Sequence, residues 1–94
     1  MCATMAEKIL ARASGLPEVH PGDHVTARPD FVMSGESLAG VWLRMMQAGV
    51  ESVWDPDRII VFLDHYSPAP SIRSAGIQKM VRDFVQHFGI GHFY

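Results

Sequence analysis

Hydrophobic and polar positions recur along this chain with helical and extended periods, and the period predicts which segments form which element. The clearest helical stripe has apolar side chains at every third or fourth position. It consists of Ile77, Met80, Val81, Phe84, Val85 and Phe88. Ser71 is placed to cap this helix at its start, and Gly89 can adopt the left-handed conformation that ends it. The pattern therefore predicts a helix over residues 72–88.

A second helical stripe follows the cap-forming residues 34–37 and ends at Gly49. Its members are Leu38, Val41, Trp42 and Met45. We interpret the tryptophan and methionine in it as core packing rather than as a cofactor site. A third, short helix is predicted near the N-terminus, where Thr4 and Glu7 have the spacing of a capping box and Gly15 stands at the end.

A continuous apolar run, Ile59 to Leu63, predicts a strand that is buried on both faces, as strands of parallel sheets are. A turn containing Pro56 precedes it, and a loop held open by Pro68 and Pro70 follows it. Short extended pieces are expected at 24–27 and 31–33, and residues 92–94 look like the start of a further strand.

The order of these elements predicts the fold class. Strands alternate with helices, which favours an α/β fold in three layers, α/β/α, around a small and mostly parallel sheet. We expect residues 1–94 to form a single partial domain. A buried central strand needs neighbours on both edges, and an apolar sheet edge left open is an aggregation hazard, so more chain or a partner should cover it.

Composition excludes several classes of partner. Eight lysines and arginines against ten acidic residues give a formal charge of −2 without a basic stripe, so binding to nucleic acid is not expected. No apolar run approaches the roughly 20 residues of a membrane span. Cys2 is the only cysteine, which excludes an internal disulfide and favours a reducing, cytoplasmic location.

The candidate chemistry lies directly after the central strand, at Asp64 and His65. Ligands of open α/β sheets bind beyond the carboxyl ends of the strands, and an imidazole beside a carboxylate suits proton transfer at neutral pH. The alternative is that a strand simply ends in two polar loop residues. His20 and His24 beside Asp23 lack a third close ligand, so we interpret them as loop histidines and assign no metal ligand.

Other charged residues are expected to have structural roles. Asp57 and Arg58 are interpreted as charges at the strand edge, and Arg28 as a charge beside a turn. His87 and His92 flank the end of the long helix, where the helix dipole favours a cation.

Six segments in order resemble the aconitase superfamily, closest to the large subunit of 3-isopropylmalate dehydratase and homoaconitase. They are Ala6-Glu7-Lys8-Ile9-Leu10-Ala11-Arg12, Pro21-Gly22-Asp23, Ala27-Arg28-Pro29-Asp30, Trp54-Asp55-Pro56-Asp57-Arg58, Asp64-His65-Tyr66-Ser67-Pro68 and Gly91-His92-Phe93-Tyr94. The resemblance covers essentially all 94 residues. Members of that family are several times longer, so it implies the N-terminal portion of an aconitase-type catalytic region.

The resemblance implies a hydro-lyase that moves a hydroxyl group in a small hydroxy di- or tricarboxylic acid, most closely 2- and 3-isopropylmalate in leucine biosynthesis. It implies a [4Fe-4S] cluster in the complete enzyme. At the matching positions, His65 protonates the departing hydroxyl and Asp64 orients the histidine. The implied partners are the remainder of the catalytic chain and a small swivel subunit or domain.

The chain also departs from the family pattern. Gly35 and Glu36 stand where the family carries a histidine or glutamine followed by an aspartate that contact substrate. The three cluster cysteines, the substrate-clamping arginines and the catalytic base of the family lie outside this stretch, so the isolated chain is expected to be inactive. The alternative function is a non-catalytic α/β module that pairs with another protein through an open sheet edge.

Overall fold

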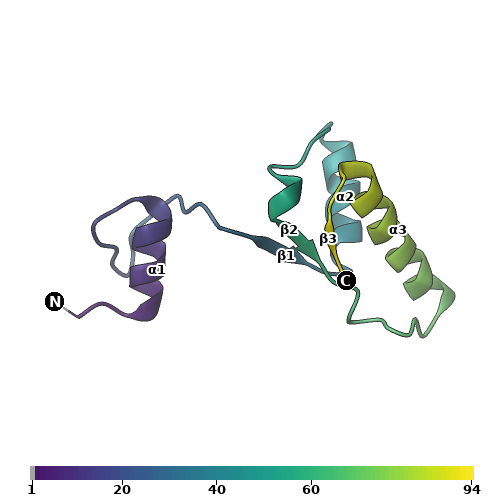
Figure 1. The fold of residues 1–94 in the computed structure, drawn as a ribbon, viewed down its shortest axis with the longest axis horizontal. Helices are drawn as coiled ribbons and strands as arrows, with labels where there is room; N and C mark the ends of the chain where they lie inside the picture. Colours follow the sequence, from purple (N-terminus) through teal and green to yellow (C-terminus); the bar gives the residue numbers. More distant parts are fainter. Residues whose placement is uncertain (1) are drawn as a thin grey trace. The chain divides into compact units, whose positions relative to one another are not determined.

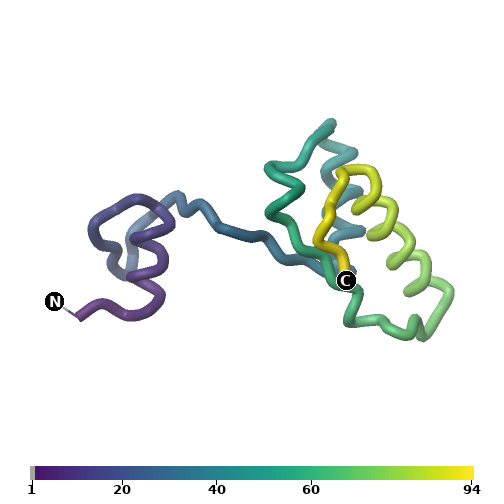
Figure 2. Tube along the Cα trace, viewed as in Figure 1, coloured from purple at the N-terminus to yellow at the C-terminus, as the bar shows by residue number. Residues whose placement is uncertain are grey.

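A computed structural model of the chain describes residues 2–94 (Figures 1 and 2). These residues form two compact units, one ending at Asp30 and one running from Phe31 to Tyr94. Among the described residues, none of the helices has both the length and the hydropathy that crossing a bilayer requires.

The first unit contains helix α1, Met5–Ser14, followed by a loop. The predicted capping box is confirmed: the amide of Glu7 donates to Thr4 Oγ1 at 3.2 Å, and the amide of Thr4 donates to Glu7 Oε2 at 2.8 Å. Gly15 ends the helix in the left-handed conformation, with φ of 69°. The extended piece expected at residues 24–27 forms no strand. The backbone after it bonds to the helix end instead, through the amide of Arg28 and the carbonyl of Ala13 at 2.9 Å.

The second unit is built on a parallel sheet of three strands in the order β1-β2-β3. The strands are β1, Val32–Ser34, β2, Ile59–Val61, and β3, His92–Phe93. Both pairings are parallel, with Ile60 of β2 lying between Met33 and His92. Two backbone hydrogen bonds of 3.0 Å, from the amide of Phe62 to Ser34 and from that of Leu63 to Tyr94, extend the pairing beyond β2. The α/β class, the parallel sheet and the central place of the apolar strand are confirmed.

Helices α2, Leu38–Gln47, and α3, Ile72–Phe88, pack side by side on the sheet (Figure 1). The buried core that joins them to β2 consists of Leu38, Ala39, Ile59, Val61, Val81, Phe84, Val85 and Ile90. Ile59 and Val61 are two residues apart, so their side chains lie on the same face of the sheet, and both helices cover that face.

The opposite face of the sheet is less buried within this unit. Ile60 is half-buried, Phe31 and Met33 are exposed, and the rings of Phe62 and Tyr94 stack with centroids 5.5 Å apart. Residues 31–94 alone therefore do not bury the central strand on both faces. The second helical layer of the expected α/β/α arrangement is not part of this unit.

The predicted ends of α3 are confirmed. Ser71 accepts a hydrogen bond from the amide of Ser74 at 3.1 Å, and Gly89 ends the helix with φ of 67°. Ile90 is buried, and its amide donates to Val85 at 3.0 Å. This tight end turns the chain back so that β3 runs beside β2, as the tube in Figure 2 shows.

The stripe predicted for α2 is confirmed in part. Leu38 is buried, and Trp42 and Met45 pack against the core, with Trp42 edge-on to Phe84 at 5.7 Å between centroids. Val41, however, is exposed, and Ala39 is buried instead. The helix is therefore rotated slightly from the orientation that its larger side chains predicted, which brings the small Ala39 close to the sheet.

Candidate functional site

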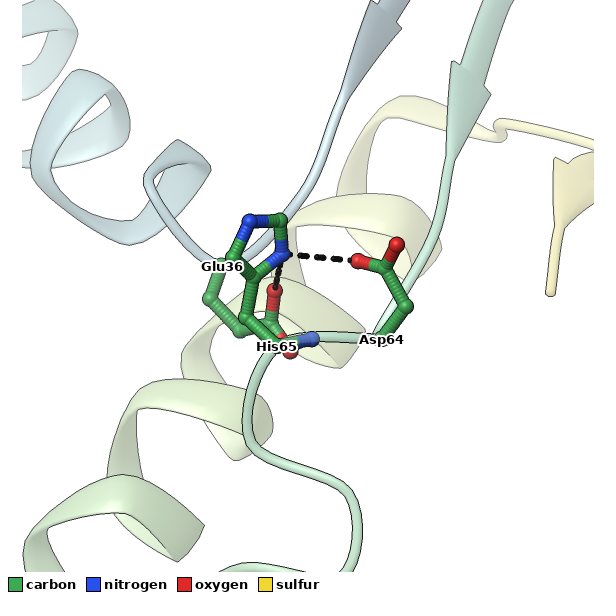
Figure 3. Close-up of side chains that lie close together, drawn as sticks. All are labelled: Glu36, Asp64 and His65. Atoms are coloured by element: carbon green, nitrogen blue, oxygen red, sulfur yellow. Dashed lines mark hydrogen bonds and ion pairs between the residues drawn. The ribbon is translucent and has the colours of Figure 1, made fainter.

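Parallel strands place the candidate residues together at the carboxyl ends of β1 and β2. Glu36 lies two residues after β1, and Asp64 and His65 lie three and four residues after β2. The carboxyl ends of neighbouring parallel strands meet, so these residues come together although almost 30 positions separate them in sequence. Figure 3 shows the three side chains converging on one point.

Asp64 and His65 form a direct pair. Nδ1 of His65 lies 2.8 Å from Oδ1 of Asp64, a distance typical of a charge-assisted hydrogen bond. Both side chains are open to solvent, with His65 74% and Asp64 68% exposed. Because the carboxylate engages Nδ1, Nε2 is the nitrogen left for a substrate.

Glu36 is the third member of the cluster, and unlike the other two it is buried, at 5% exposure. Its Oε1 accepts hydrogen bonds from the amides of His65 at 2.9 Å and Tyr66 at 3.1 Å. Its Oε2 lies 3.4 Å from His65 Nδ1, within ion-pair range, but has no hydrogen-bond partner. The buried carboxylate thus fixes the backbone that carries His65.

Gly35 lets the two strand ends approach each other. A Cβ atom at this position would lie 3.2 Å from the carbonyl oxygen of Phe62, and 3.8 Å from both Asp64 Oδ1 and His65 Nδ1. A side chain here would be tight, and the carbonyl of Phe62 would have to shift by a few tenths of an ångström. The glycine leaves room at the point where the end of β1 lies beside the end of β2.

The charges in the cluster shift two pKa values. The hydrogen bond and the negative charge of Asp64, with the charge of Glu36, raise the pKa of His65 and so favour the imidazolium. Burial raises the pKa of Glu36. Backbone hydrogen bonds from Tyr66, from its own amide and from His65 lower it, as does the charge of His65, and together they outweigh burial. The net pKa of Glu36 is lowered, so this carboxyl group is ionised at neutral pH.

The loop after His65 is held by α3. Gln78, which is buried, donates from Nε2 to the carbonyl of Tyr66 at 2.7 Å and to Ser67 Oγ at 3.3 Å. Ser67 in turn donates to the carbonyl of Leu63 at 2.6 Å. These contacts limit the positions that the His65 backbone can take.

A pocket of about 530 Å³ opens beside the cluster, between α2 and the start of α3. Glu36, His65 and Tyr66 form one part of its wall, and Arg73 adds a cation to another. The remaining lining residues are mostly small or apolar. They are Gly35, Ser37, Ala39, Gly40, Leu43, Ile77 and Met80. A small anionic molecule would meet both the imidazole and a guanidinium here.

The other polar residues singled out from the sequence lie elsewhere. His20 forms ion pairs with Glu18 and Asp23 in the first unit, at 3.9 and 3.7 Å, and all three side chains are exposed. In the second unit, the ring of His87 packs on Trp42 at 5.9 Å and that of His92 on Phe31 at 6.5 Å. Arg58 pairs with Asp55 at 3.4 Å in the short 3-10 helix Pro56–Arg58.

The residues of this chain can be compared with those that an iron-sulfur cluster requires. An iron-sulfur cluster is held by several cysteine thiolates, whereas this chain has one cysteine, Cys2, which is exposed. The residues present therefore do not fit a [4Fe-4S] cluster by themselves.

Sequence reasoning missed Glu36, Gln78 and Arg73 as members of the site. Glu36 was interpreted as one of the residues that cap a helix, and as a departure from the pattern of the family. Gln78 and Arg73 lie on α3, where only the apolar positions carried a signal. Their roles come from contacts with the loop after β2, which local patterns do not encode.

Comparisons with known proteins relate the chain to one part of much longer proteins. It is 45% identical over 95 residues to the 3-isopropylmalate dehydratase large subunit 1 of Methanopyrus kandleri, and 41% identical to the 3-isopropylmalate dehydratase large subunit of Aquifex aeolicus. Identity to the probable 3-isopropylmalate dehydratase large subunit of Methanothermobacter thermautotrophicus is 42%. Each match covers 100% of this chain but only 22 to 23% of the relative, so the chain spans about a fifth of their length. No family model matches the chain.

Proposed function

Because the chain is homologous over its full length to part of 3-isopropylmalate dehydratase large subunits, and so belongs to the aconitase family, we propose that it supplies the proton donor of a hydro-lyase site. The observation that carries the proposal is the 2.8 Å contact between Asp64 and His65 at the carboxyl end of β2. A proton donor must be protonated, oriented and open to substrate, and the pair meets all three requirements.

In the proposed step, the Nε2–H of His65 gives its proton to the hydroxyl group that leaves the substrate, and the hydroxyl departs as water. Asp64 holds the Nδ1–H and stabilises the positive ring before transfer. In the reverse direction, neutral Nε2 accepts a proton from the water that adds to the double bond. Glu36 acts on this step through the backbone of His65, which it positions.

The proposed substrate is a small hydroxy di- or tricarboxylic acid, with 2- and 3-isopropylmalate the leading pair, which would place the protein in leucine biosynthesis in the cytoplasm. Arg73 in the wall of the pocket supports this class, since guanidinium groups pair with carboxylates. The apolar wall formed by Leu43, Ile77 and Met80 suits an alkyl substituent.

The rest of the proposed site has to come from outside these 94 residues. The residues of this chain cannot hold a [4Fe-4S] cluster, which in the family polarises the substrate hydroxyl when bound. We propose that the remainder of the catalytic chain and a swivel subunit or domain supply the cluster ligands and the catalytic base. The contribution of this chain is limited to the proton donor and one wall of the substrate pocket.

The test uses the complete reading frame that contains this sequence, produced with its small subunit and reconstituted without oxygen. Interconversion of 2- and 3-isopropylmalate is measured. His65→Ala is expected to lower kcat about 10²- to 10⁴-fold, the usual contribution of a positioned proton donor. Arg73→Gln is expected to raise KM with a smaller change in kcat. The control is His24→Ala, which removes a histidine outside the site.

Turnover in His65→Ala equal to that of the unsubstituted enzyme and of His24→Ala would remove His65 from the mechanism.

A specific observation favours a second candidate, a non-catalytic module. Phe31, Met33 and Tyr94 leave an exposed apolar face on the sheet. A reading frame that continues into cysteine motifs after Tyr94 would support the first function, and one that stops there would favour the second.

A further inference from the structure

The feature that the proposed function leaves unexplained is the second oxygen of the buried Glu36 carboxylate. Oε1 is satisfied by two backbone amides, but Oε2 has no hydrogen-bond partner although it is shielded from solvent. An ionised oxygen without a partner in a buried position is costly. His65 Nδ1 lies 3.4 Å away, and its closer partner, at 2.8 Å, is Asp64.

Three potential ligand atoms lie together here, and one of them belongs to the Glu36 carboxylate. One atom each from Glu36, Asp64 and His65 lie within 4.8 Å of one another, and this is the one such group found among residues 2–94. Ligands about 2.0 to 2.2 Å from one cation lie no more than about 4.4 Å apart, so a small movement of the two exposed side chains would complete the site. Figure 3 shows the two carboxylates approaching Nδ1 from different sides.

We propose that Glu36, Asp64 and His65 form a binding site for one divalent transition-metal cation of the Zn²⁺ type. The cation would replace the proton on Nδ1 and give Oε2 of Glu36 the partner that it lacks. The cation-bound form is therefore an alternative to the protonated form of His65 that acts in the proposed dehydration step. Two carboxylates then face a divalent charge.

The donor set decides the class of cation. One imidazole nitrogen and two carboxylate oxygens suit Zn²⁺ and similar first-row cations, whereas Ca²⁺ and Mg²⁺ prefer oxygen ligands alone. Three protein ligands leave a fourth position open. Glu36 and His65 both line the 530 Å³ pocket, so that position is accessible to a small molecule.

The surroundings hold the ligands in place. Outer hydrogen bonds orient metal ligands, and here the amides of His65 and Tyr66 fix the Glu36 carboxylate with Oε2 directed at the cluster. Gly35 keeps the space between the strand ends free of a side chain. The site therefore has one rigid ligand and two exposed ligands that can adjust.

The first unit offers a matched control. His20 also lies between two carboxylates, those of Glu18 and Asp23, at 3.9 and 3.7 Å. All three of these side chains are exposed, and none presents a buried oxygen without a partner. The two carboxylates face different ring nitrogens, Glu18 at Nε2 and Asp23 at Nδ1, so these residues attract a cation by charge without offering three ligands to it.

The test is isothermal titration of the 94-residue chain, without a histidine tag, with Zn²⁺ alone. We expect one strong site per chain. His65→Gln changes an exposed ligand and is expected to weaken binding by more than about 10-fold. Glu36→Gln keeps an acceptor for the two amides and should weaken it similarly. Asp23→Asn, the control, should leave the strong site unchanged.

A dissociation constant unchanged in His65→Gln, or weakened equally in Asp23→Asn, overturns the proposal and indicates adventitious binding. Co²⁺ gives a second readout, because its visible spectrum reports coordination by nitrogen and oxygen. That spectrum should be lost in His65→Gln and kept in Asp23→Asn. The site is measured without substrate and does not depend on the proposed hydro-lyase function, so either proposal can fail alone.

Discussion

Glu36 holds the backbone of His65, its Oε1 accepting the His65 amide hydrogen at 2.9 Å across 29 positions of sequence. The same oxygen accepts the amide of Tyr66 at 3.1 Å. A single buried carboxylate thus joins the end of β1 to the loop that follows β2. The geometry of the Asp64–His65 pair depends on this link, because the link fixes where the backbone of the pair lies.

The first prediction concerns the stability of the link. Glu36→Ala leaves two backbone donors without their acceptor and should lower the free energy of unfolding by about 2 to 3 kcal/mol. Glu36→Gln keeps a carbonyl oxygen in the same place, so its loss should be less than about 1.5 kcal/mol. Urea denaturation of the three proteins measures the difference. Equal losses in the two variants would show that the amide bonds are not what Glu36 contributes.

The second prediction concerns acid. The pKa of Glu36 is lowered in the folded chain, so its ionised form adds stability that is fully present above the pKa of the unfolded state. That contribution is lost as the pH falls through the folded pKa. Glu36→Gln should therefore lose less stability than the unsubstituted chain between neutral and strongly acidic pH. Denaturation curves at several pH values test this, and parallel pH profiles would contradict it.

The third prediction concerns the core beneath the site. Phe84 is 2% exposed and touches Trp42 and Phe88, so Phe84→Ala should destabilise the chain by about 3 to 5 kcal/mol. Ile72 lies on the same helix but is 94% exposed, so Ile72→Ala should change stability by less than about 0.5 kcal/mol. Thermal denaturation followed by circular dichroism compares them. Similar melting temperatures for the two variants would mean that α3 does not pack as described.

The fourth prediction uses two glycines at the end of α3. An added Cβ meets no atom within 4 Å at either Gly89 or Gly91, but Gly89 alone of the two has a left-handed φ, 67°. Gly89→Ala should therefore cost about 1 to 2 kcal/mol through backbone strain alone. Gly91→Ala should be nearly neutral. A larger loss in Gly91→Ala, measured by urea denaturation, would contradict the described end of the helix.

Much of the fold followed from local signals. Helical spacing and cap residues located all three α-helices, and the apolar run from Ile59 to Leu63 located the central strand, because these features act over a few residues. Two expectations needed more than local information. The rotation of α2, which buries Ala39 and exposes Val41, depends on how closely the helix approaches the sheet. The second face of the sheet stays largely exposed in residues 31–94, and an apolar run in the sequence does not tell whether both of its faces are covered within one unit.

Only part of the candidate site, the pair Asp64 and His65, was predicted from the sequence. Asp64 and His65 are adjacent in sequence, so their position at the end of a strand was enough to suggest the pair. Glu36 has no such signature, since its partners are the amides of residues 29 and 30 positions away. A glutamate after a strand is usually solvated, whereas this one is buried beside the loop that follows β2, which is far away in sequence.

The central claim is that Asp64 holds His65 as a charged, solvent-open proton donor, and the pKa of His65 in the metal-free chain tests it most directly. The imidazole resonances are followed by NMR from pH 5 to 9 in the presence of a chelator, in the unsubstituted chain and in Asp64→Asn. We predict a pKa for His65 above its ordinary value of 6.5, and a lower pKa in Asp64→Asn. A pKa at or below 6.5 that does not change in Asp64→Asn would contradict the account.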